Sequence, residues 1–427
     1  MVLEMLMESL FAVVDIYFVG QLGAEAVATV GLTESILTIV YSLGFGAAMG
    51  ATALVARRVG EKNILAANDV AAQAIILGLL VSVIVSIAGI FYSKELLQLM
   101  GAEPKIVNEM SGYMQWMLGG NFVIVLLFLL NGVFRGAGNA SVAMHALWIA
   151  NGLNIILDPC LILGLGPFPE CGLVGAAYAT NIGRACGVLF QLYILFNGKA
   201  LIKVIWSQLK PHWSVIISLI KVSAGGTGQF IIASSSWIFL MRIMSEFGSD
   251  ALAGYTIAIR IFIFTVLPAW GMANAAATLV GQNLGANRPD RAEKAVFLTL
   301  RNTLIFISGV SVIYFIYAEE LIRIFTDDED AVKNGILCLK YLSVSYILFA
   351  VEMVTIQAFN GAGDTRTPTI LNIIFFWLMQ IPISYFLALY FGLGPEGVYL
   401  GIIISESILA LVALYLFKLG KWKTTKV

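Results

Sequence analysis

The chain has 427 residues, of which 59% are hydrophobic and 12% are charged, and its mean hydropathy is +0.91. This composition excludes a soluble globular protein, because too few polar residues are present to cover an apolar core of this size. A net charge of −1 gives no basic surface for nucleic acid. The chain also lacks the phosphate-binding Gly-x-x-x-x-Gly-Lys-Ser/Thr and metal-binding His-Glu-x-x-His strings. We therefore expect an integral membrane protein that needs no cofactor and binds no nucleic acid.

Twelve apolar stretches are long enough to cross a bilayer, which takes roughly 20 residues of helix. In chain order they are residues 3–20, 29–54, 68–92, 111–134, 142–164, 173–196, 214–243, 253–280, 294–317, 335–360, 368–391 and 397–418. The sequence predicts an all-α integral membrane fold with twelve transmembrane helices.

The second half of the chain repeats the first. Small residues recur at a constant shift of 225 residues, as from Gly23 to Gly248 and from Gly136 to Gly361. Because each copy contains six spans, both enter the membrane from the same side, so the repeat is parallel and the lobes should surround a central cavity. The predicted organisation is an N-terminal six-helix lobe, a cytoplasmic linker and a C-terminal six-helix lobe, at residues 1–200, 201–213 and 214–427.

Lysine and arginine are unevenly shared between the two sets of loops. One set, which includes the C-terminal tail, holds fifteen of them, whereas the opposite set holds only Lys94, Lys105, Arg323 and Lys333. Basic loops face the cytoplasm in membrane proteins. The sequence therefore predicts a multi-pass protein of the plasma or inner membrane with both termini in the cytoplasm.

Polar side chains inside the predicted spans indicate where function lies, because a charge at mid-membrane costs roughly 3 kcal/mol and needs a partner or a water-filled cavity. Asp15 lies in the first span. Asn151, Asn154 and Asp158 lie in the fifth, at spacings of three and four that place them on one helical face. Pro159 frees the backbone carbonyl four residues earlier. A carboxylate, an amide and a free carbonyl suit a proton or a small hard cation.

A structural interpretation stays open, in which Asp158 ends a kinked helix and the asparagines hold neighbouring helices together. The repeat favours a functional role for the two acids. At a shift of 225, Asp15 corresponds to Leu240 and Asp158 to Ile383. The second half keeps the helical frame without these carboxylates, so we expect the coupling chemistry in the N-terminal lobe.

Other ionisable residues within the spans are weaker candidates for substrate contact or gating. Glu8 lies two turns before Asp15 on the same face and could share its cavity. Structural ion pairing, for example between Arg260 and Glu352, is an equal alternative. The full set of these candidates is Glu8, Glu34, Asn151, Arg184, Arg260 and Glu352.

Several short motifs occur along the chain. They are Val14-Asp15-Ile16, Gly20-Gln21-Leu22-Gly23, Val55-Ala56-Arg57-Arg58-Val59-Gly60-Glu61, its copy Val280-Gly281-Gln282-Asn283-Leu284-Gly285-Ala286, and Arg135-Gly136-Ala137-Gly138. Together they resemble the motifs of one family, the multidrug and toxic compound extrusion (MATE) transporters. The resemblance covers essentially the whole chain.

Within that family the chain looks similar to the DinF-like branch. The branch's cation site combines a first-span Asp, a fifth-span Asn-x-x-x-Asp and a sixth-span Thr, which match Asp15, Asn154, Asp158 and Thr180. The resemblance implies antiport of drugs against protons, or against a sodium ion bound at these four residues. Relatives that have an acidic cation site in the second lobe use a Glu of the seventh span. In this chain, Ser234, Ser235 and Ser236 occupy that region of the seventh span. A second-lobe sodium site is therefore not expected.

The expected function is export of small organic cations or amphipathic drugs by a monomer in a lipid bilayer, with rocker-type alternating access between the lobes. Asp15 and Asp158 should share a proton that competes with a cationic drug for the same charge. Two alternatives stay open: a flippase for lipid-linked saccharides or lipids, and a membrane-embedded enzyme. The flippase should have a strongly cationic cavity, and the enzyme should have clustered nucleophiles or metal ligands. The sequence shows neither, so we expect a transporter and not an enzyme.

Overall fold

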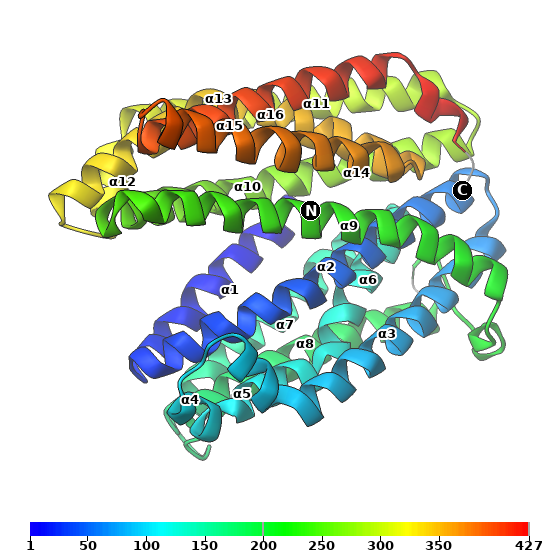
Figure 1. The fold of residues 1–427 in the computed structure, drawn as a ribbon. Coiled ribbons are helices and arrows are strands. Elements are labelled where there is room, and N and C mark those ends of the chain that lie inside the picture. The colour runs from blue at the N-terminus through cyan, green and yellow to red at the C-terminus, as the bar shows by residue number, and fades with distance from the viewer. Residues whose placement is uncertain (199, 426–427) are drawn as a thin grey trace. The chain divides into compact units, whose positions relative to one another are not determined.

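The structure, a computed structural model, describes residues 1–198 and 200–425, and these residues contain helices and no strand (Figure 1). Two lysines of the basic loops, Lys199 and Lys426, lie outside the described residues. The first helices are α1 (Val2–Gly20), α2 (Ala24–Gly60), α3 (Ile64–Leu99), α4 (Pro104–Glu109), α5 (Ser111–Gly119), α6 (Asn121–Gly136), α7 (Ala140–Ile162), α8 (Gly172–Asn197) and η1 (Trp206–Leu209). The later ones are α9 (Trp213–Met244), η2 (Ser245–Phe247), α10 (Ser249–Gly285), α11 (Pro289–Ile316), α12 (Ala318–Arg323), α13 (Glu329–Ala362), α14 (Arg366–Asn372), η3 (Ile373–Gln380), α15 (Ile381–Tyr385), η4 (Phe386–Tyr390), α16 (Pro395–Lys418) and η5 (Lys421–Thr424).

These helices account for all twelve predicted spans. In the described part of the chain, ten segments are long and apolar enough to cross a membrane, and α5 with α6 forms an eleventh that bends by 40° between its two parts. The twelfth is α1, whose 19 residues include Glu4, Glu8 and Asp15 and are otherwise mostly apolar. Several helices run past the predicted ends, because regular hydrogen bonding continues beyond the apolar stretch. For instance, α2 carries Arg57 and Arg58 in its last turn.

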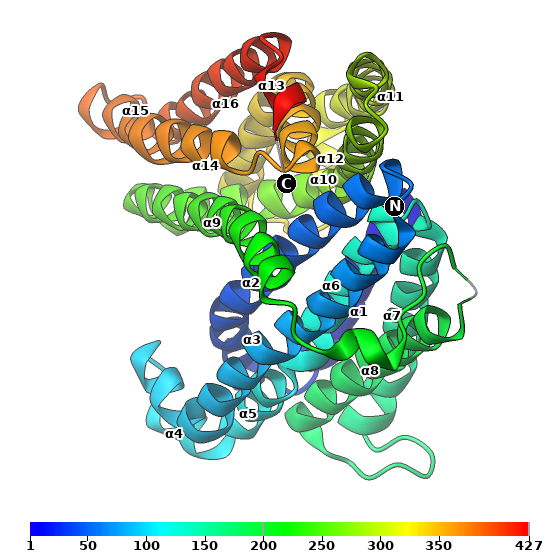
Figure 2. The ribbon, with the colours of Figure 1, turned by 90° about the vertical axis from the view of Figure 1, so that its right-hand side faces the viewer.

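The chain divides into two compact units. Unit 1 comprises Met1 and Leu3–Thr227, and unit 2 comprises Val2 and Gly228–Val427, so the division falls inside α9. Each unit has its own apolar core. In unit 1 the buried core includes Leu37, Met114 and Ile124. In unit 2 the long helices α10, α13 and α16 pack together, as Figure 2 shows for α13 and α16.

The repeat seen in the sequence is also a repeat of backbone conformation. Gly138 after α6 and Gly363 after α13 both have left-handed φ angles, of 83° and 84°. Lys62 and Asn287, also 225 residues apart, are the only described non-glycine residues with positive φ, at 59° and 54°. Equivalent turns therefore end equivalent helices in the two units.

Two residues before each of the turns at Gly138 and Gly363, another glycine allows two helices to approach closely. A methyl group on Gly136 of α6 would lie 2.7 Å from the carbonyl oxygen of Thr52 on α2. A methyl group on Gly361 of α13 would lie 2.6 Å from the carbonyl carbon of Ala277 on α10. Such distances are too short for any side chain. The two glycines thus have a packing role.

The segment that follows α8 is tied to unit 1 by one buried side chain. Gln73 of α3 donates from its Nε2 to the carbonyl oxygens of Gln208 and Lys210, both at 3.0 Å, and its Oε1 accepts from the backbone N–H of His212 at 2.9 Å. Gln73 is fully buried. These three hydrogen bonds fix the path of the chain as it approaches α9.

Candidate functional site

The predicted polar face of the fifth span is present on α7. Asn151, Asn154 and Asp158 are 1%, 2% and 0% exposed, and Pro159 lies within the same continuous helix. Three fully buried polar side chains on one face of a membrane helix are unfavourable without partners. Their hydrogen-bond partners lie on α7 itself, on α1 and on α8.

Small residues bring α8 against α7. A methyl group on Gly187 of α8 would lie 2.8 Å from the carbonyl oxygen of Ala146 on α7, and one on Gly183 would collide with the carbonyl oxygen of Ala150. Without side chains at these points, the two helix backbones come close together. Thr180, one turn before Gly183, consequently reaches the polar face of α7.

Asn154 joins the fifth-span and sixth-span residues. Its Nδ2 donates to the hydroxyl oxygen of Thr180 at 3.1 Å and to Oδ1 of Asp158 at 3.2 Å. The Asp158 contact follows from the spacing of four along one helix, whereas the Thr180 contact depends on the packing of α8. The three residues predicted for α7 and α8 thus form one hydrogen-bonded group.

Asp15 of α1 supplies a second carboxylate, which interacts with this group electrostatically. Asp15 is partly buried, and its charge interacts electrostatically with that of Asp158. Asp15 also interacts with Glu34 of α2 and Arg184 of α8. All four residues predicted for the cation site, Asp15, Asn154, Asp158 and Thr180, therefore lie in one neighbourhood of unit 1.

A second polar group lies one helical turn along α7. Asn151 donates from Nδ2 to Oε2 of Glu8 at 2.9 Å, which ties α1 to α7. Oε1 of Glu8 lies 3.9 Å from the guanidinium of Arg184. Arg184 is 4% exposed, and its guanidinium also lies 3.5 Å from the hydroxyl of Tyr41 on α2. Glu8, Asn151 and Arg184, all weaker candidates from the sequence, are thus neighbours of the central site.

Three aromatic residues of this region were not predicted from the sequence. The charge on Arg184 lies over the rings of Phe11 and Tyr41, 5.6 and 5.7 Å from their centroids. Tyr113 of α5, which is 3% exposed, interacts electrostatically with Asp15 and Arg184. Aromatic residues are common in membrane helices, so the sequence gave no signal that set these apart.

The site has buried oxygen acceptors that no donor satisfies in the part of the chain that the structure describes. Oδ1 of Asp15, Oδ1 of Asn154 and Oδ2 of Asp158 are buried and make no hydrogen bond among the described residues. A buried acceptor without a donor costs free energy, so these oxygens are suited to a proton or a hard cation. The described residues contain no group of three His, Cys, Asp or Glu side chains that would hold a transition metal.

The remaining two candidates lie in unit 2 and do not pair. Arg260 is on the exposed face of α10, whereas Glu352 of α13 is buried and interacts electrostatically with another acid, Glu406 of α16. The alternative of an Arg260 to Glu352 ion pair is therefore not realised among the described residues. Neither residue belongs to the group around Asp158.

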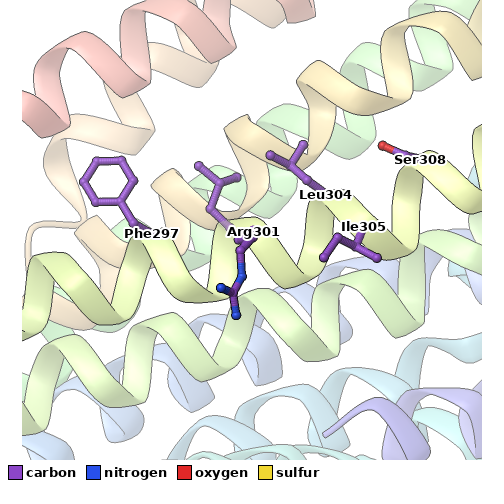
Figure 3. Close-up of a pocket in the computed structure, with 6 residues that line it drawn as sticks. Phe297, Arg301, Leu304, Ile305 and Ser308 are labelled. Carbon is purple, nitrogen blue, oxygen red and sulfur yellow. The ribbon is translucent and has the colours of Figure 1, made fainter.

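Unit 2 also has a hollow on the surface of α11. It is lined by Phe297, Leu300, Arg301, Leu304, Ile305 and Ser308, and it contains none of the predicted site residues (Figure 3). All six lining residues come from one helix. The hollow is thus a shallow groove on a mostly apolar face.

Twelve membrane helices in two repeated units, with a cluster of buried acids in the first, define a multi-pass membrane transport protein. The chain belongs to the MatE family, whose model matches residues 1–160 and 227–386. The two matched stretches correspond to the two repeats. Family membership makes the chain a transporter and not an enzyme, as the sequence predicts.

Proteins with related sequences are named as drug exporters. The chain is 28% identical to the probable multidrug resistance protein NorM of Thermotoga maritima, covering 99% of this chain and 91% of that protein. It is 25% identical to the multidrug export protein MepA of Staphylococcus aureus, covering 100% of this chain and 93% of that protein.

Solved structures share the fold over nearly their whole length. A MATE transporter in complex with MaL6 matches with a TM-score of 0.93 at 29% identity, covering 100% of this chain and 95% of that one. An outward-facing multidrug resistance MATE transporter of the MOP superfamily matches with the same TM-score at 28% identity and the same coverage. These matches agree with the twelve-helix fold. The DinF-like branch stays a prediction.

Proposed function

We propose that this protein exports small organic cations or amphipathic drug-like compounds in exchange for an inward-moving cation. The names of its relatives and the ligand-bound MATE structure support a drug-like substrate. The acidic cluster of unit 1 supports cation coupling. The observation that carries the proposal is the contact of Asn154 with both Asp158 and Thr180, next to the second carboxylate of Asp15.

The proposed coupling rests on competition for negative charge. Two neighbouring carboxylates in a buried site cannot easily both be ionised, so a proton shared by Asp15 and Asp158 neutralises the site. When that proton leaves toward the cytoplasm, the site becomes anionic and attracts a cationic drug. When a proton binds from the outer side, the attraction ends and the drug is released. Because proton and drug do not occupy the site together, their movements are opposite.

Sodium is the second candidate for the coupling ion. The unpartnered oxygens of Asp15, Asn154 and Asp158 are the type of ligand that hard cations prefer, and the Thr180 hydroxyl is adjacent. The carboxylates serve either ion, so the distinction needs a transport measurement.

The proposed transport cycle alternates access by rocking one six-helix lobe against the other, with the protein acting as a monomer and both termini in the cytoplasm. The parallel repeat and the separate core of each unit support this cycle, since each unit can move as a body. The basic loops support the orientation.

Transport by purified protein in liposomes tests the proposal. The proton and sodium gradients are imposed independently, and the movement of a fluorescent cationic dye is recorded. We expect the gradient of one of the two ions to drive the dye across the membrane in the direction opposite to that ion. Dye movement at a rate that depends on neither gradient would overturn the antiport proposal. Translocation of lipid head groups without any gradient would also overturn it and would favour the flippase alternative. The variant Glu103→Gln, which changes an exposed acid far from the cluster in sequence, serves as the matched control.

A further inference from the structure

The groove on α11 lies along one face of the helix, and this face changes from basic to apolar. Lys294, Arg301, Ile305 and Val312 follow one another at spacings of seven, four and seven residues, which place them on the same face. All four are exposed, and Arg301 and Ile305 line the groove (Figure 3). One face of a segment that is long and apolar enough to cross a membrane thus has two cations in its first half and apolar side chains in its second.

Arg301 makes no ion pair in the part of the chain that the structure describes. Its nearest acid along the sequence is Glu293, which pairs instead with Lys423 of η5 at 2.6 Å. The guanidinium of Arg301 lies 3.5 Å from the side-chain oxygen of Asn302, the next residue, which carries no charge. An arginine inside a membrane span is costly without a counter-charge. The bilayer can supply that counter-charge in the phosphates of its lipids.

We propose that this face of α11 binds one anionic phospholipid of the cytoplasmic leaflet, with the lipid phosphate at Arg301 and an acyl chain along the apolar half. The assignment to this leaflet rests on the proposed orientation with cytoplasmic termini, in which the ninth span, α11, begins at the cytoplasmic side. Side chains of a helix lean toward its N-terminus, so Arg301 leans toward Lys294 and the cytoplasmic surface. A guanidinium donates two parallel N–H groups to a phosphate, and Lys294 adds a second positive charge two turns closer to that surface.

The apolar half of this face has the length of one lipid leaflet. From Arg301 to Val312 the helix rises about 16 Å, and half of the hydrocarbon core is about 15 Å thick. Ile305 and Val312 are 67% and 56% exposed. Beside them, a methyl group on Gly309 would have no atom within 4 Å. An acyl chain can therefore lie along this half of the helix from the head-group region to the middle of the bilayer.

The head-group end of the groove is held in place by the C-terminal part of the chain. Phe297, which lines the groove, packs edge-on against Phe417 of α16, with 6.0 Å between the ring centroids. One turn earlier on α11, Glu293 is tied to η5 by its ion pair with Lys423. A surface that is already formed loses less conformational entropy when a ligand binds. These contacts thus favour binding of a lipid head group at the first half of α11.

Charge determines which phospholipid this face should prefer. The head group of phosphatidylcholine carries a cation of its own, which repels Lys294 and Arg301, whereas phosphatidylglycerol has a net negative charge. The attraction between an anionic lipid surface and one lysine or arginine corresponds to about a fivefold difference in affinity. Removing one of the two cations should therefore weaken phosphatidylglycerol binding by about fivefold.

Native mass spectrometry of the purified protein in detergent tests the proposal, because it counts bound lipids while phosphatidylglycerol or phosphatidylcholine is added. We expect the first phosphatidylglycerol to bind more tightly than the first phosphatidylcholine, and we expect Arg301→Gln to weaken that first binding step by about fivefold. Lys294→Gln should have a similar effect. Arg323→Gln, at an arginine whose charge is already balanced by Glu319 and Glu329, should leave this step unchanged. Unchanged phosphatidylglycerol binding by Arg301→Gln would overturn the proposal.

Two further measurements separate a lipid site from a site for any anion, and a loss of binding from a loss of folding. Inorganic phosphate and glycerol 3-phosphate carry charge without an acyl chain, so neither should displace phosphatidylglycerol at the concentration at which the lipid binds. Displacement by either would overturn the assignment to a lipid. Because Arg301 is exposed, Arg301→Gln should have the melting temperature of the unsubstituted protein in detergent without lipid.

If Arg301→Gln does not fold, two other variants decide the question. Arg301→Lys, which keeps the charge, must then retain the preference for phosphatidylglycerol, and Lys294→Gln must weaken it; any other result would overturn the proposal. These measurements in detergent do not depend on transport or on the orientation of the protein in a membrane. Their outcome is therefore separate from that of the proposed antiport.

Discussion

The side-chain amide of Asn154 on α7 lies 3.1 Å from the hydroxyl of Thr180 on α8 and also donates to Asp158. This contact links residues 26 positions apart in the chain and gives Asp158 a fixed donor. Among the described residues, one oxygen of Asp158 and one of Asn154 have no hydrogen-bond partner, and both residues lie near Asp15. The ability of the site to exchange a cation should depend on this link.

Removing the hydroxyl of Thr180 should impair coupling. Thr180→Val keeps the side-chain shape but leaves the Asn154 amide with one partner fewer, at a cost of about 1 kcal/mol for a lost hydrogen bond. We expect weaker gradient-driven dye export from Thr180→Val and near-normal export from Thr180→Ser, which retains the hydroxyl. Equal export by the two variants would show that Thr180 acts only in packing.

The close approach of α7 and α8 predicts a strong effect at Gly183. A methyl group there would collide with the carbonyl oxygen of Ala150, so Gly183→Ala should lower the free energy of unfolding by about 1–3 kcal/mol and weaken export. The control is Gly152→Ala on α7, where the nearest atom to the new methyl would be Met7 Cε at 4.0 Å. That change should be neutral or stabilising. Thermal unfolding of both variants checks the contrast, and similar melting temperatures would argue against the packing explanation.

Arg184 should matter for stability because it is the cation beside Glu8. Arg184→Met leaves Glu8 without its ion-pair partner and removes the charge from the rings of Phe11 and Tyr41. We expect a loss of stability on the order of 3 kcal/mol, since an unpaired charge is left partly buried. Adding Glu8→Gln should recover part of that loss. If the double variant is as unstable as the sum of the two single ones, Arg184 and Glu8 are not coupled.

Gln73 should hold the chain segment before α9 against α3. Gln73→Leu keeps the volume but removes three hydrogen bonds to backbone groups of residues 208–212. Each lost bond costs about 1 kcal/mol, so the segment should become mobile. Hydrogen exchange at the His212 amide should speed up in this variant, while exchange in the core of α7 stays the same. Unchanged exchange at His212 would contradict this role.

Much of the fold could be predicted from the sequence because apolar length and a fixed shift are local signals. The twelve spans follow from length and hydropathy, and the repeat of turns such as Gly138 and Gly363 follows from the shift of 225 residues. The polar face of α7 follows from helical spacing. These features can be predicted without knowing which helices are in contact.

Features that depend on packing between distant helices could not be predicted from the residues alone. Thr180 was expected from the family resemblance, because nothing in its local sequence indicates contact with Asn154. Tyr41 and Tyr113 gave no signal. The alternative of an ion pair between Arg260 and Glu352 could not be decided from the sequence, because a charge in one span does not reveal which side chain of another span faces it. In the structure Arg260 lies on an exposed face and Glu352 is buried.

The most direct test of the unit 1 site is gradient-driven dye export by Asp158→Asn in liposomes, compared with the unsubstituted protein and Glu103→Gln at equal amounts of folded protein. Asparagine keeps the shape of Asp158 but cannot carry the exchanged proton or the negative charge. We predict that Asp158→Asn inserts and folds normally yet shows no gradient-driven export, and that Asp15→Asn behaves in the same way. Normal export by both variants, with an unchanged response to pH, would contradict the assignment of the coupling site to Asp15 and Asp158.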